Sequence, residues 1–224
     1  MPDRGRFIVF EGAEGVGKST QLRRLCDRLE AAHVPYLGVR EPGQTSLGND
    51  IRRIVLDSDH PIVPPAEALL FMAARAQLVA QDVRPALADG RMVLSDRFFL
   101  STYAYQAFGR GLPLEDVAGA NRLATGGLVP DLTLLFDLPE GEGLVRTDRR
   151  GTRDRIERAT DDFHARVVQA FRTFAAPAWQ GAHPEVGPVV RIDATGTEAE
   201  VADRVWLALH AGWPETFPLH DVSQ

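Results

Sequence analysis

The sequence predicts an α/β fold with a five-stranded, mostly parallel sheet that has helices on both faces. Three observations carry this prediction. Short apolar segments rich in β-branched and aromatic residues alternate with helical patterns along all 224 residues. A glycine loop of the form G-x-x-x-x-G-K-[ST], residues 12–19, lies between the first strand and the first helix. Segment 131–137 is nearly all apolar inside its acidic ends, as expected for a strand buried on both faces.

The individual elements follow in order along the chain. Leu22, Leu25, Cys26 and Leu29 recur at i, i+3, i+4 and i+7, which predicts a first helix. The expected strands are 6–10, 34–40, 91–95, 131–137 and 189–193, and the expected helices are about 20–33, 46–56, 66–88, 100–108, 113–125, 139–150, 160–176 and 197–210. Ligands of such a sheet bind at the carboxyl ends of its strands. We expect one domain over residues 1–212 and a loosely held tail over 213–224.

The glycine loop predicts a site for nucleotide phosphates. Its glycines let backbone N–H groups turn inward around an anion, and the following helix N-terminus adds partial positive charge. Lys18 would reach the β- and γ-phosphates, and the Ser19 hydroxyl would bind Mg²⁺. The alternative is an accidental glycine-rich turn. Against it, Lys18 is the only lysine among 25 basic residues, and a compact ammonium suits a tight phosphate loop better than a planar guanidinium.

Composition excludes several other classes of protein. A formal charge of −6 argues against a nucleic-acid binder held by a general basic surface. The single cysteine, Cys26, forms no internal disulfide and favours a cytoplasmic protein. The start of the chain lacks an apolar signal region, and no apolar run is long enough to span a membrane, so we expect no membrane partner. A guanine-nucleotide switch would need an N-K-x-D motif, which the sequence lacks.

Several residues near the ends of the other strands are candidates for binding a second molecule, which would accept a phosphoryl group from the nucleotide. Phe71 and Arg75 lie four residues apart and share a helix face, although Phe71 alone would more often be a core residue. Asp96 and Arg97 follow the third strand, where a carboxylate suits Mg²⁺ and an arginine suits a phosphate. An ordinary ion pair at a helix start is the alternative for these two residues. Asp137 is a second candidate for the metal.

Together with the glycine loop, four stretches resemble bacterial thymidylate kinases over about residues 7–209. They are Arg40-Glu41-Pro42-Gly43, Phe71-Met72-Ala73-Ala74-Arg75, Asp96-Arg97 followed by Ser101, Thr102, Tyr105 and Gln106, and Asp154-Arg155-Ile156-Glu157. The resemblance implies the fold of phosphate-loop nucleoside monophosphate kinases, transfer of the γ-phosphoryl group of ATP to dTMP, Mg²⁺ as cofactor, and a homodimer. Another deoxynucleotide or nucleoside kinase on the same fold is the alternative.

The resemblance also implies the roles of individual residues. ATP would contact Gly12, Ala13, Glu14, Gly15, Val16, Gly17, Lys18, Ser19, Thr20, Asp193 and Thr195. The acceptor dTMP would contact Glu14, Arg40, Pro42, Phe71, Arg75, Arg97, Ser101, Thr102, Tyr105 and Gln106, with thymine stacked on Phe71 and Arg40, Arg75 and Arg97 on the phosphate. Mg²⁺ would be bound by Ser19 and Asp96, and the catalytic groups would be Lys18, Asp96, Arg97, Arg153 and Arg149.

Arg149 and Arg153 belong to an expected lid, about residues 146–158. Arg146, Arg149, Arg150 and Arg153 recur at i, i+3, i+4 and i+7, so a helix would place four like charges on one face. A solvated charged face is the usual reason for such a run. Gly151 weakens the helix, as expected for a segment that opens and closes. Because the glycine loop itself carries no basic residue before Lys18, the resemblance implies that the lid supplies the catalytic arginine, with Arg153 preferred over Arg149.

Overall fold

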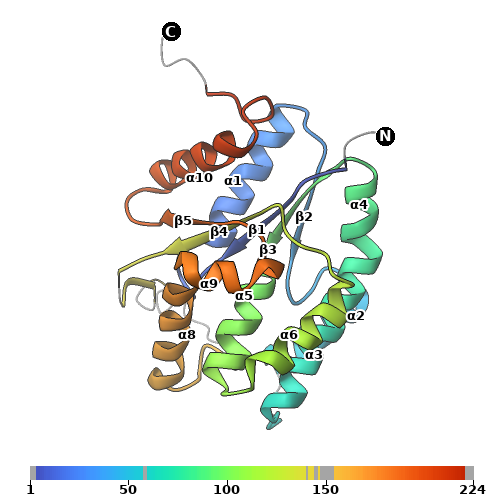
Figure 1. Ribbon diagram of the computed structural model, residues 1–224, viewed down its shortest axis with the longest axis vertical. Coiled ribbons are helices and arrows are strands. Elements are labelled where there is room, and N and C mark those ends of the chain that lie inside the picture. The colour runs from blue at the N-terminus through green and yellow to red at the C-terminus, as the bar shows by residue number, and fades with distance from the viewer. Residues whose placement is uncertain (1–3, 58–59, 140, 144–145, 147–153, 220–224) are drawn as a thin grey trace.

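The five strands form one parallel sheet in the order β2-β3-β1-β4-β5 (Figure 1). The computed structural model describes residues 4–57, 60–139, 141–143, 146 and 154–219. The strands are β1 Phe7–Glu11, β2 Tyr36–Arg40, β3 Met92–Asp96, β4 Leu132–Asp137 and β5 Val189–Asp193. All five lie within two residues of their expected bounds, and the predicted α/β class with its five-stranded sheet is confirmed.

Helices cover both faces of the sheet. The α-helices are α1 Lys18–Ala31, α2 Ser46–Arg52, α3 Pro64–Leu78, α4 Arg84–Ala88, α5 Phe99–Thr102, α6 Leu114–Thr125, α8 Asp161–Phe174, α9 Pro177–Ala182 and α10 Glu198–Gly212. Three π-helical segments continue α-helices: η1 Arg53–Asp57, η2 Val79–Val83 and η3 Tyr103–Gly109, and η4 Pro184–Val186 is a 3₁₀ turn. The long helix expected over 66–88 is therefore α3, η2 and α4 in one run.

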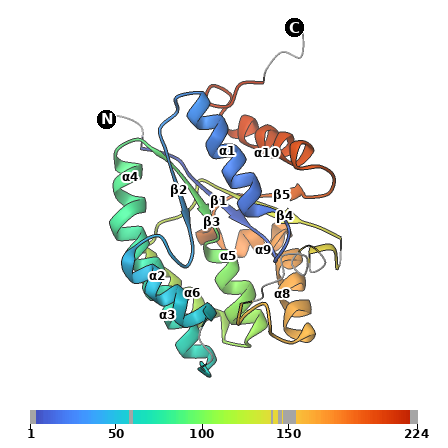
Figure 2. The ribbon, with the colours of Figure 1, turned by 180° about the vertical axis from the view of Figure 1, so that it is seen from behind.

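Alternation along β1 divides the core into two parts. Phe7 and Val9 face one apolar cluster, shared with helices from α2 to α8, whereas Ile8 and Phe10 face the other, shared with α1 and α10. Figure 1 and the reverse view in Figure 2 show α1 and α10 on one side of the sheet and the remaining helices on the other. No helix in the described part of the chain is long and apolar enough to cross a membrane.

Two parts of the chain differ from expectation. Residues 177–186 form α9 and η4, which the sequence pattern did not indicate. The expectation of a loosely held tail is wrong for residues 213–219. Phe217 is fully buried against Trp206 with ring centroids 5.2 Å apart, and Trp206 Nε1 donates to Pro218 O at 2.9 Å. One buried aromatic and one indole hydrogen bond are enough to hold this short segment. The helix expected over 139–150 lies mostly outside the described residues.

The register of the sheet places the chemically important ends side by side. Asp96, the last residue of β3, pairs with Phe10 of β1 on one side and with Arg40 of β2 on the other. Phe10 is two residues before Gly12, which opens the glycine loop. Parallel pairing therefore brings the glycine loop, Asp96 and Arg40 to one edge of the sheet.

Candidate active site

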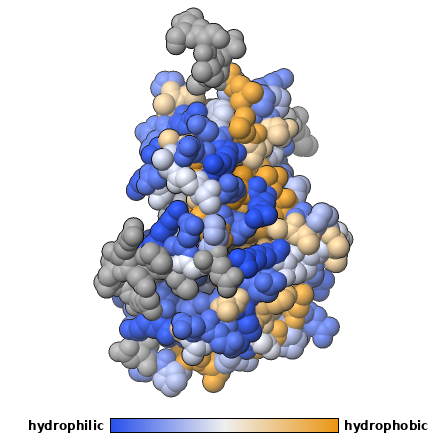
Figure 3. All heavy atoms as spheres, turned by 90° about the vertical axis from the view of Figure 1, so that its left-hand side faces the viewer, coloured by the Kyte–Doolittle hydropathy of each residue, from blue (hydrophilic) through white to orange (hydrophobic). Residues whose placement is uncertain are grey.

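A cavity of about 560 Å³ opens at this edge of the sheet. Figure 3 views the side toward which the arrowheads of β4 and β5 point in Figure 1, and hydrophilic residues gather in the middle of that face. The predicted site residues that line the cavity are Glu14, Gly15, Val16, Gly17, Lys18, Ser19, Thr20, Arg40, Pro42, Phe71, Arg75, Asp96, Arg97, Ser101, Thr102, Tyr105 and Gln106. We call the part formed by residues 14–21 and 194–201 the donor half, and the part formed by the remaining lining residues the acceptor half. Glu14 and Asp96 belong to both halves, because Glu14 binds Arg97 and Tyr105 and Asp96 accepts from Ser19.

The glycine loop wraps around the side chain of Lys18. Gly15 and Gly17 adopt positive φ values of 73° and 90°, which favour glycine. The Lys18 ammonium donates to Gly12 O at 2.9 Å and to Ala13 O at 2.6 Å. One of its three hydrogens is left for a phosphate oxygen. Burial, together with the nearby Arg97, lowers the pKa of Lys18 to about 8.

The chain after β4 passes close to the same loop. A Cβ atom on Gly15 would lie 2.0 Å from the carbonyl oxygen of Gly143, and one on Gly143 would lie 2.4 Å from Glu14 O. Gly15 and Gly143 therefore allow the two backbones to approach each other closely. Arg146, at the start of the expected lid, also lines the cavity, whereas Arg149 and Arg153 lie outside the described residues.

Ser19 and Asp96 have the chemistry of a magnesium site. The Ser19 hydroxyl donates directly to Asp96 Oδ2. Mg²⁺ typically takes one or two protein oxygens and completes its shell with substrate phosphates and water, so this pair fits the ion. Asp137, the second candidate, instead pairs with Arg191 at 2.5 Å and lines a smaller, separate cavity. No cluster of three or more possible metal-binding side chains occurs within the described residues.

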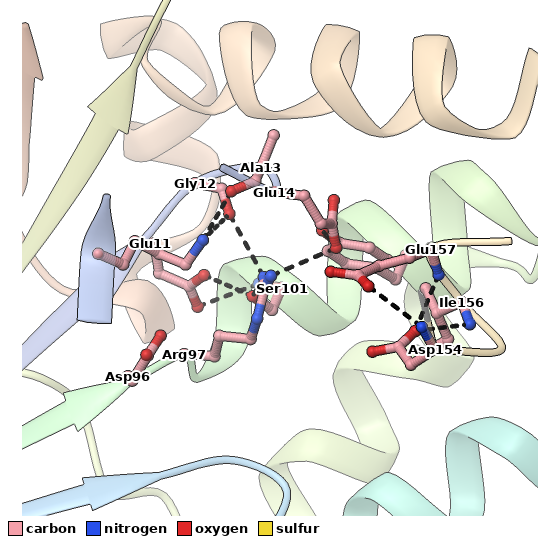
Figure 4. Close-up of polar contacts among 12 residues, drawn as sticks. Glu11, Gly12, Ala13, Glu14, Asp96, Arg97, Ser101, Asp154, Ile156 and Glu157 are labelled. Carbon is pink, nitrogen blue, oxygen red and sulfur yellow. Dashed lines mark hydrogen bonds and ion pairs between the residues drawn. The ribbon is translucent and has the colours of Figure 1, made fainter. Parts of the chain in front are cut away.

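Arg97 lies at the boundary between the two halves. Its guanidinium donates to Ser101 Oγ at 2.9 Å, to Gly12 O at 3.3 Å and to Glu14 Oε1 at 3.4 Å (Figure 4). Burial disfavours the charge on Arg97, but Tyr105 and Glu14 outweigh it and raise the pKa of the guanidinium. Burial acts in the opposite sense on Glu14, whose pKa is nevertheless lowered because Arg97 and Lys18 stabilise its carboxylate. The result is a charged cluster in which Tyr105 also donates to Glu14.

The guanidinium of Arg75 is fully hydrogen-bonded within the protein. The residue is 2 % exposed, and five hydrogen bonds use the five N–H groups of its side chain. Nε and Nη2 both donate to Glu41 Oε2, Nη2 also donates to Phe98 O, and Nη1 donates to Thr102 Oγ1 and Asn121 Oδ1. These bonds give no support to the expected contact between Arg75 and the acceptor phosphate, which stays a prediction. Arg75 does line the acceptor half.

Phe71 fits both interpretations of its position in the sequence, as a core residue and as a residue of the binding site. It is partly buried against the core cluster beneath α3 and also lines the cavity. Gln106, which also lines the cavity, donates from Nε2 to Glu67 Oε1 at 3.1 Å, and this bond orients its amide. Glu67 also binds Arg110 and Arg155, and Arg155 belongs to the Asp154–Glu157 motif. These contacts anchor the end of the expected lid to α3.

The loop after β5 lies in the donor half, but not with the side chains expected. Ala194, Gly196 and Glu198 line the cavity, whereas Asp193 and Thr195 do not. The Asp193 carboxylate accepts from Thr195 N at 2.9 Å, so it is used to shape the turn. Gly12 and Ala13 likewise do not line the cavity, and contribute carbonyl oxygens that hold Lys18.

Sequence reasoning missed three charged residues that matter to the acceptor half. Arg52 lines the cavity and donates to Pro42 O at 3.0 Å, and burial together with Arg40 lowers its pKa. Glu41 holds Arg75, and burial raises its pKa despite that arginine. Glu67 is 1 % exposed. Glu41 belongs to the Arg40–Gly43 motif, but the motif gave no reason to expect its bond to Arg75. Arg52 is a cation at the end of α2, the helix that follows β2, and this position could have suggested a role in the site.

Comparison with known proteins places the chain in a family. Residues 10–182 match the family model described as thymidylate kinase. A thymidylate kinase of Synechococcus sp. (strain JA-2-3B'a(2-13)) is 47 % identical over 208 residues, covering 93 % of this chain and 96 % of the relative. The thymidylate kinase of Deinococcus radiodurans is 46 % identical over 92 % of this chain and 97 % of its own length. With a family model over most of its length and such relatives, the chain belongs to the thymidylate kinase family.

Proposed function

We propose that the protein transfers the γ-phosphoryl group of ATP to the phosphate of dTMP, giving ADP and dTDP. The observation that carries the proposal is the single cavity that contains both the glycine loop and the acceptor half. Two nucleotides bound in these halves would direct their phosphates at each other near Arg97. Catalysis of this reaction depends mainly on alignment and charge, because phosphoryl transfer requires little covalent participation by the protein.

In the donor half, backbone N–H groups of residues 14–20 and the third hydrogen of Lys18 would bind the ATP phosphates. Ser19 and Asp96 would hold Mg²⁺, which when bound offsets the negative charge of the phosphates. Lid arginines Arg153 and Arg149 remain proposed donors of positive charge to the transferred group. They lie outside the described residues, and the support for them is Arg146, which belongs to the same run and lines the cavity.

In the acceptor half, we assign the monophosphate to Arg97, Arg40 and Arg52 rather than to Arg75, because the N–H groups of Arg75 are already bonded within the protein. The base would stack on Phe71 beside Thr102 and Gln106, with Pro42 and Ser101 completing the contact surface. The sugar would lie against Glu14 and Tyr105, which are hydrogen-bonded to each other. In that position the Tyr105 ring would disfavour a 2′-hydroxyl.

An acceptor panel tests the assignment. Purified protein with ATP and Mg²⁺ is assayed for ADP release with dTMP, dUMP, dCMP, dGMP and thymidine, and the product is identified by chromatography. We expect dTMP to give the highest kcat/KM. Preference for a different acceptor would favour the alternative, another deoxynucleotide or nucleoside kinase. No ADP release with any acceptor would contradict kinase activity altogether.

We also propose a homodimer formed through the layer of α2, α3 and α6. Exposed apolar side chains occur on these packed helices, including Leu69 at 63 % and Leu123 at 86 %. Leu69→Glu combined with Leu123→Glu should yield monomers in sedimentation velocity. The matched control is Leu207→Glu, on α10 across the sheet and 53 % exposed, which should leave the dimer intact. A wild-type monomer would contradict the proposal.

A cytoplasmic location stays a proposal supported by the single free Cys26.

A further inference from the structure

Glu11 is a buried charged residue that none of the roles above uses. It is the last residue of β1, adjacent to Gly12, and it is 0 % exposed. Its carboxylate accepts three hydrogen bonds, all from the segment that follows β3. Oε1 accepts from Phe98 N at 2.7 Å and from Ser101 N at 3.0 Å, and Oε2 accepts from Ser101 Oγ at 2.6 Å. Figure 4 shows Glu11 and Ser101 directed toward each other below Gly12.

These bonds cap the start of α5 from a different strand. The first N–H groups of a helix have no partner within the helix, and a side-chain oxygen commonly satisfies them. Phe98, the residue before α5, makes no side-chain cap of its own. Glu11 supplies the missing acceptor, and it does so as a buried anion, which requires hydrogen bonds of this kind to be tolerated.

The capped segment includes a residue in an unfavourable backbone conformation. Arg97 has a φ of +78°, in the left-handed region that costs a non-glycine residue free energy. Such a conformation persists only where its surroundings enforce it. Arg97 N donates to Phe10 O at 3.0 Å, Ser95 Oγ donates to Arg97 O at 2.8 Å, and the next amide, Phe98 N, is held by Glu11.

This backbone conformation aims the guanidinium of Arg97 into the cavity. From that position Arg97 contacts Ser101 Oγ at 2.9 Å and Gly12 O at 3.3 Å. Glu11 binds the same Ser101 hydroxyl, so one carboxylate fixes both the arginine backbone and the side chain on which its guanidinium rests. Loss of Glu11 would release Phe98 N and Ser101 together.

We propose that Glu11 is a positioning residue that sets the affinity for the acceptor monophosphate by holding Arg97 in its left-handed conformation. The inference rests on the proposed function through the assignment of Arg97 to the acceptor phosphate. Glu11 has no contact with the nucleotides itself. Its loss should therefore weaken the acceptor half and leave the ATP phosphates, which bind to the loop backbone and Lys18, with little change.

The test compares three substitutions of Glu11 in the full chain. Glu11→Ala removes all three acceptors, Glu11→Asp keeps the charge but is one methylene too short, and Glu11→Gln keeps an oxygen for the two amides. In the Glu11→Ala and Glu11→Asp variants, we expect KM for dTMP to rise about tenfold or more and KM for ATP to stay within about twofold of wild type. Glu11→Gln should recover most of the affinity, because its amide nitrogen can donate to Ser101 Oγ.

Asp131 provides the matched control at the opposite end of β1. Its carboxylate also accepts from a backbone amide, Phe7 N at 2.7 Å, and pairs with Arg4 at 2.7 Å. Asp131→Ala should lower the unfolding midpoint without changing the ratio of the two KM values. Should Glu11→Ala not fold, Glu11→Asp decides the outcome by the same ratio.

Two results would overturn the inference: unchanged KM values in Glu11→Asp, or an equal rise in both. If the wild-type enzyme is active, either result contradicts only the positioning role of Glu11 and leaves the proposed function intact. A wild-type protein that releases no ADP with any monophosphate counts against the proposed function instead. Isothermal titration with dTMP in the absence of ATP then still measures the effect of Glu11, because the acceptor affinity needs no turnover.

Discussion

The donor and acceptor halves of the cavity hold charge in different ways. The donor half has one cation, Lys18, surrounded by backbone carbonyls of a local loop. The acceptor half has arginines that are tied to buried carboxylates from distant parts of the chain, as in the pair of Arg75 with Glu41, 34 residues away. One half is built from a continuous segment, and the other depends on packing of several elements.

Because of this difference, substitutions in the two halves should affect activity and stability differently. Within the described residues Lys18 is held by backbone carbonyls and has carboxylates nearby but none in direct contact, so its removal should destabilise the protein much less than the loss of a direct ion pair. A buried ion pair such as Arg75–Glu41 leaves an uncompensated charge when one member is removed. We therefore expect damage in the donor half to reduce turnover, and damage in the acceptor half to reduce both stability and acceptor affinity.

The largest expected effect is that of Arg75→Met. Glu41 would remain buried without its partner, and breaking a buried pair in this way costs about 3–5 kcal/mol of unfolding free energy. Urea unfolding at pH 7 measures the loss. Because burial already raises the pKa of Glu41, its carboxyl group takes up a proton more readily as the pH falls, and the loss should shrink toward pH 5.

The double variant Arg75→Met with Glu41→Gln is the control for this effect. It removes both charges, so most of the stability should return while the affinity for dTMP stays low. If Arg75→Met unfolded at the wild-type urea concentration, the acceptor half would not depend on this ion pair, and the contrast between the halves would disappear.

Lys18→Ala is expected to have the next largest effect. Removal of one fixed positive donor from the transferring phosphates costs about 10²–10³ in kcat. The Kd for dTMP and the urea midpoint should change much less than kcat, since Lys18 acts on the acceptor half only through its charge near Glu14. Steady-state kinetics and titration calorimetry measure the two quantities separately. A matched loss of dTMP affinity would show that the halves are not independent.

The sequence predicted the donor half well because its geometry is local. The glycine loop, its strand and its helix are contiguous, and residues 14–20 line the cavity as the motif requires. Even there, Asp193 and Thr195 do not line the cavity, and the turn after β5 directs the Asp193 carboxylate back onto the backbone of Thr195. A motif gives the position of a turn but not where each side chain in it points.

The acceptor half was predicted as a set of residues but not as a network. Phe71 and Arg75 share a helix face as their spacing requires, yet spacing could not reveal that Glu41 and Asn121 use the donors of Arg75. These partners are 34 and 46 residues away in sequence, so only the folded sheet brings them together. Glu11 escaped notice for the same reason, since its partners are 87 and 90 residues away.

A smaller effect is expected from pH in the donor half. Lys18 must carry a proton to bind phosphate, and its pKa is lowered to about 8, so kcat/KM for ATP should fall as the pH rises through 8 and reach about a tenth at pH 9. Bound ATP favours the charged form, so the fall in kcat should occur at higher pH. The titration of kcat/KM for dTMP at saturating ATP should follow kcat. A flat kcat/KM profile for ATP between pH 7 and 9.5 would contradict the environment described for Lys18.

The smallest effect on activity is expected at Cys26, on the same helix as Lys18 but outside both halves. Burial, with a contribution from Asp27, raises the pKa of its thiol to about 11, so little thiolate exists near neutrality. Iodoacetamide should modify Cys26 slowly at pH 8 and about tenfold faster per pH unit above it, as followed by mass spectrometry. Because the side chain lies against Gly38 of β2 rather than the cavity, fully modified protein returned to pH 7.5 should keep its KM values for ATP and dTMP within about twofold. A selective loss of ATP affinity would mean that the donor half extends along α1 beyond its first turn, and the local character ascribed to that half would have to be given up.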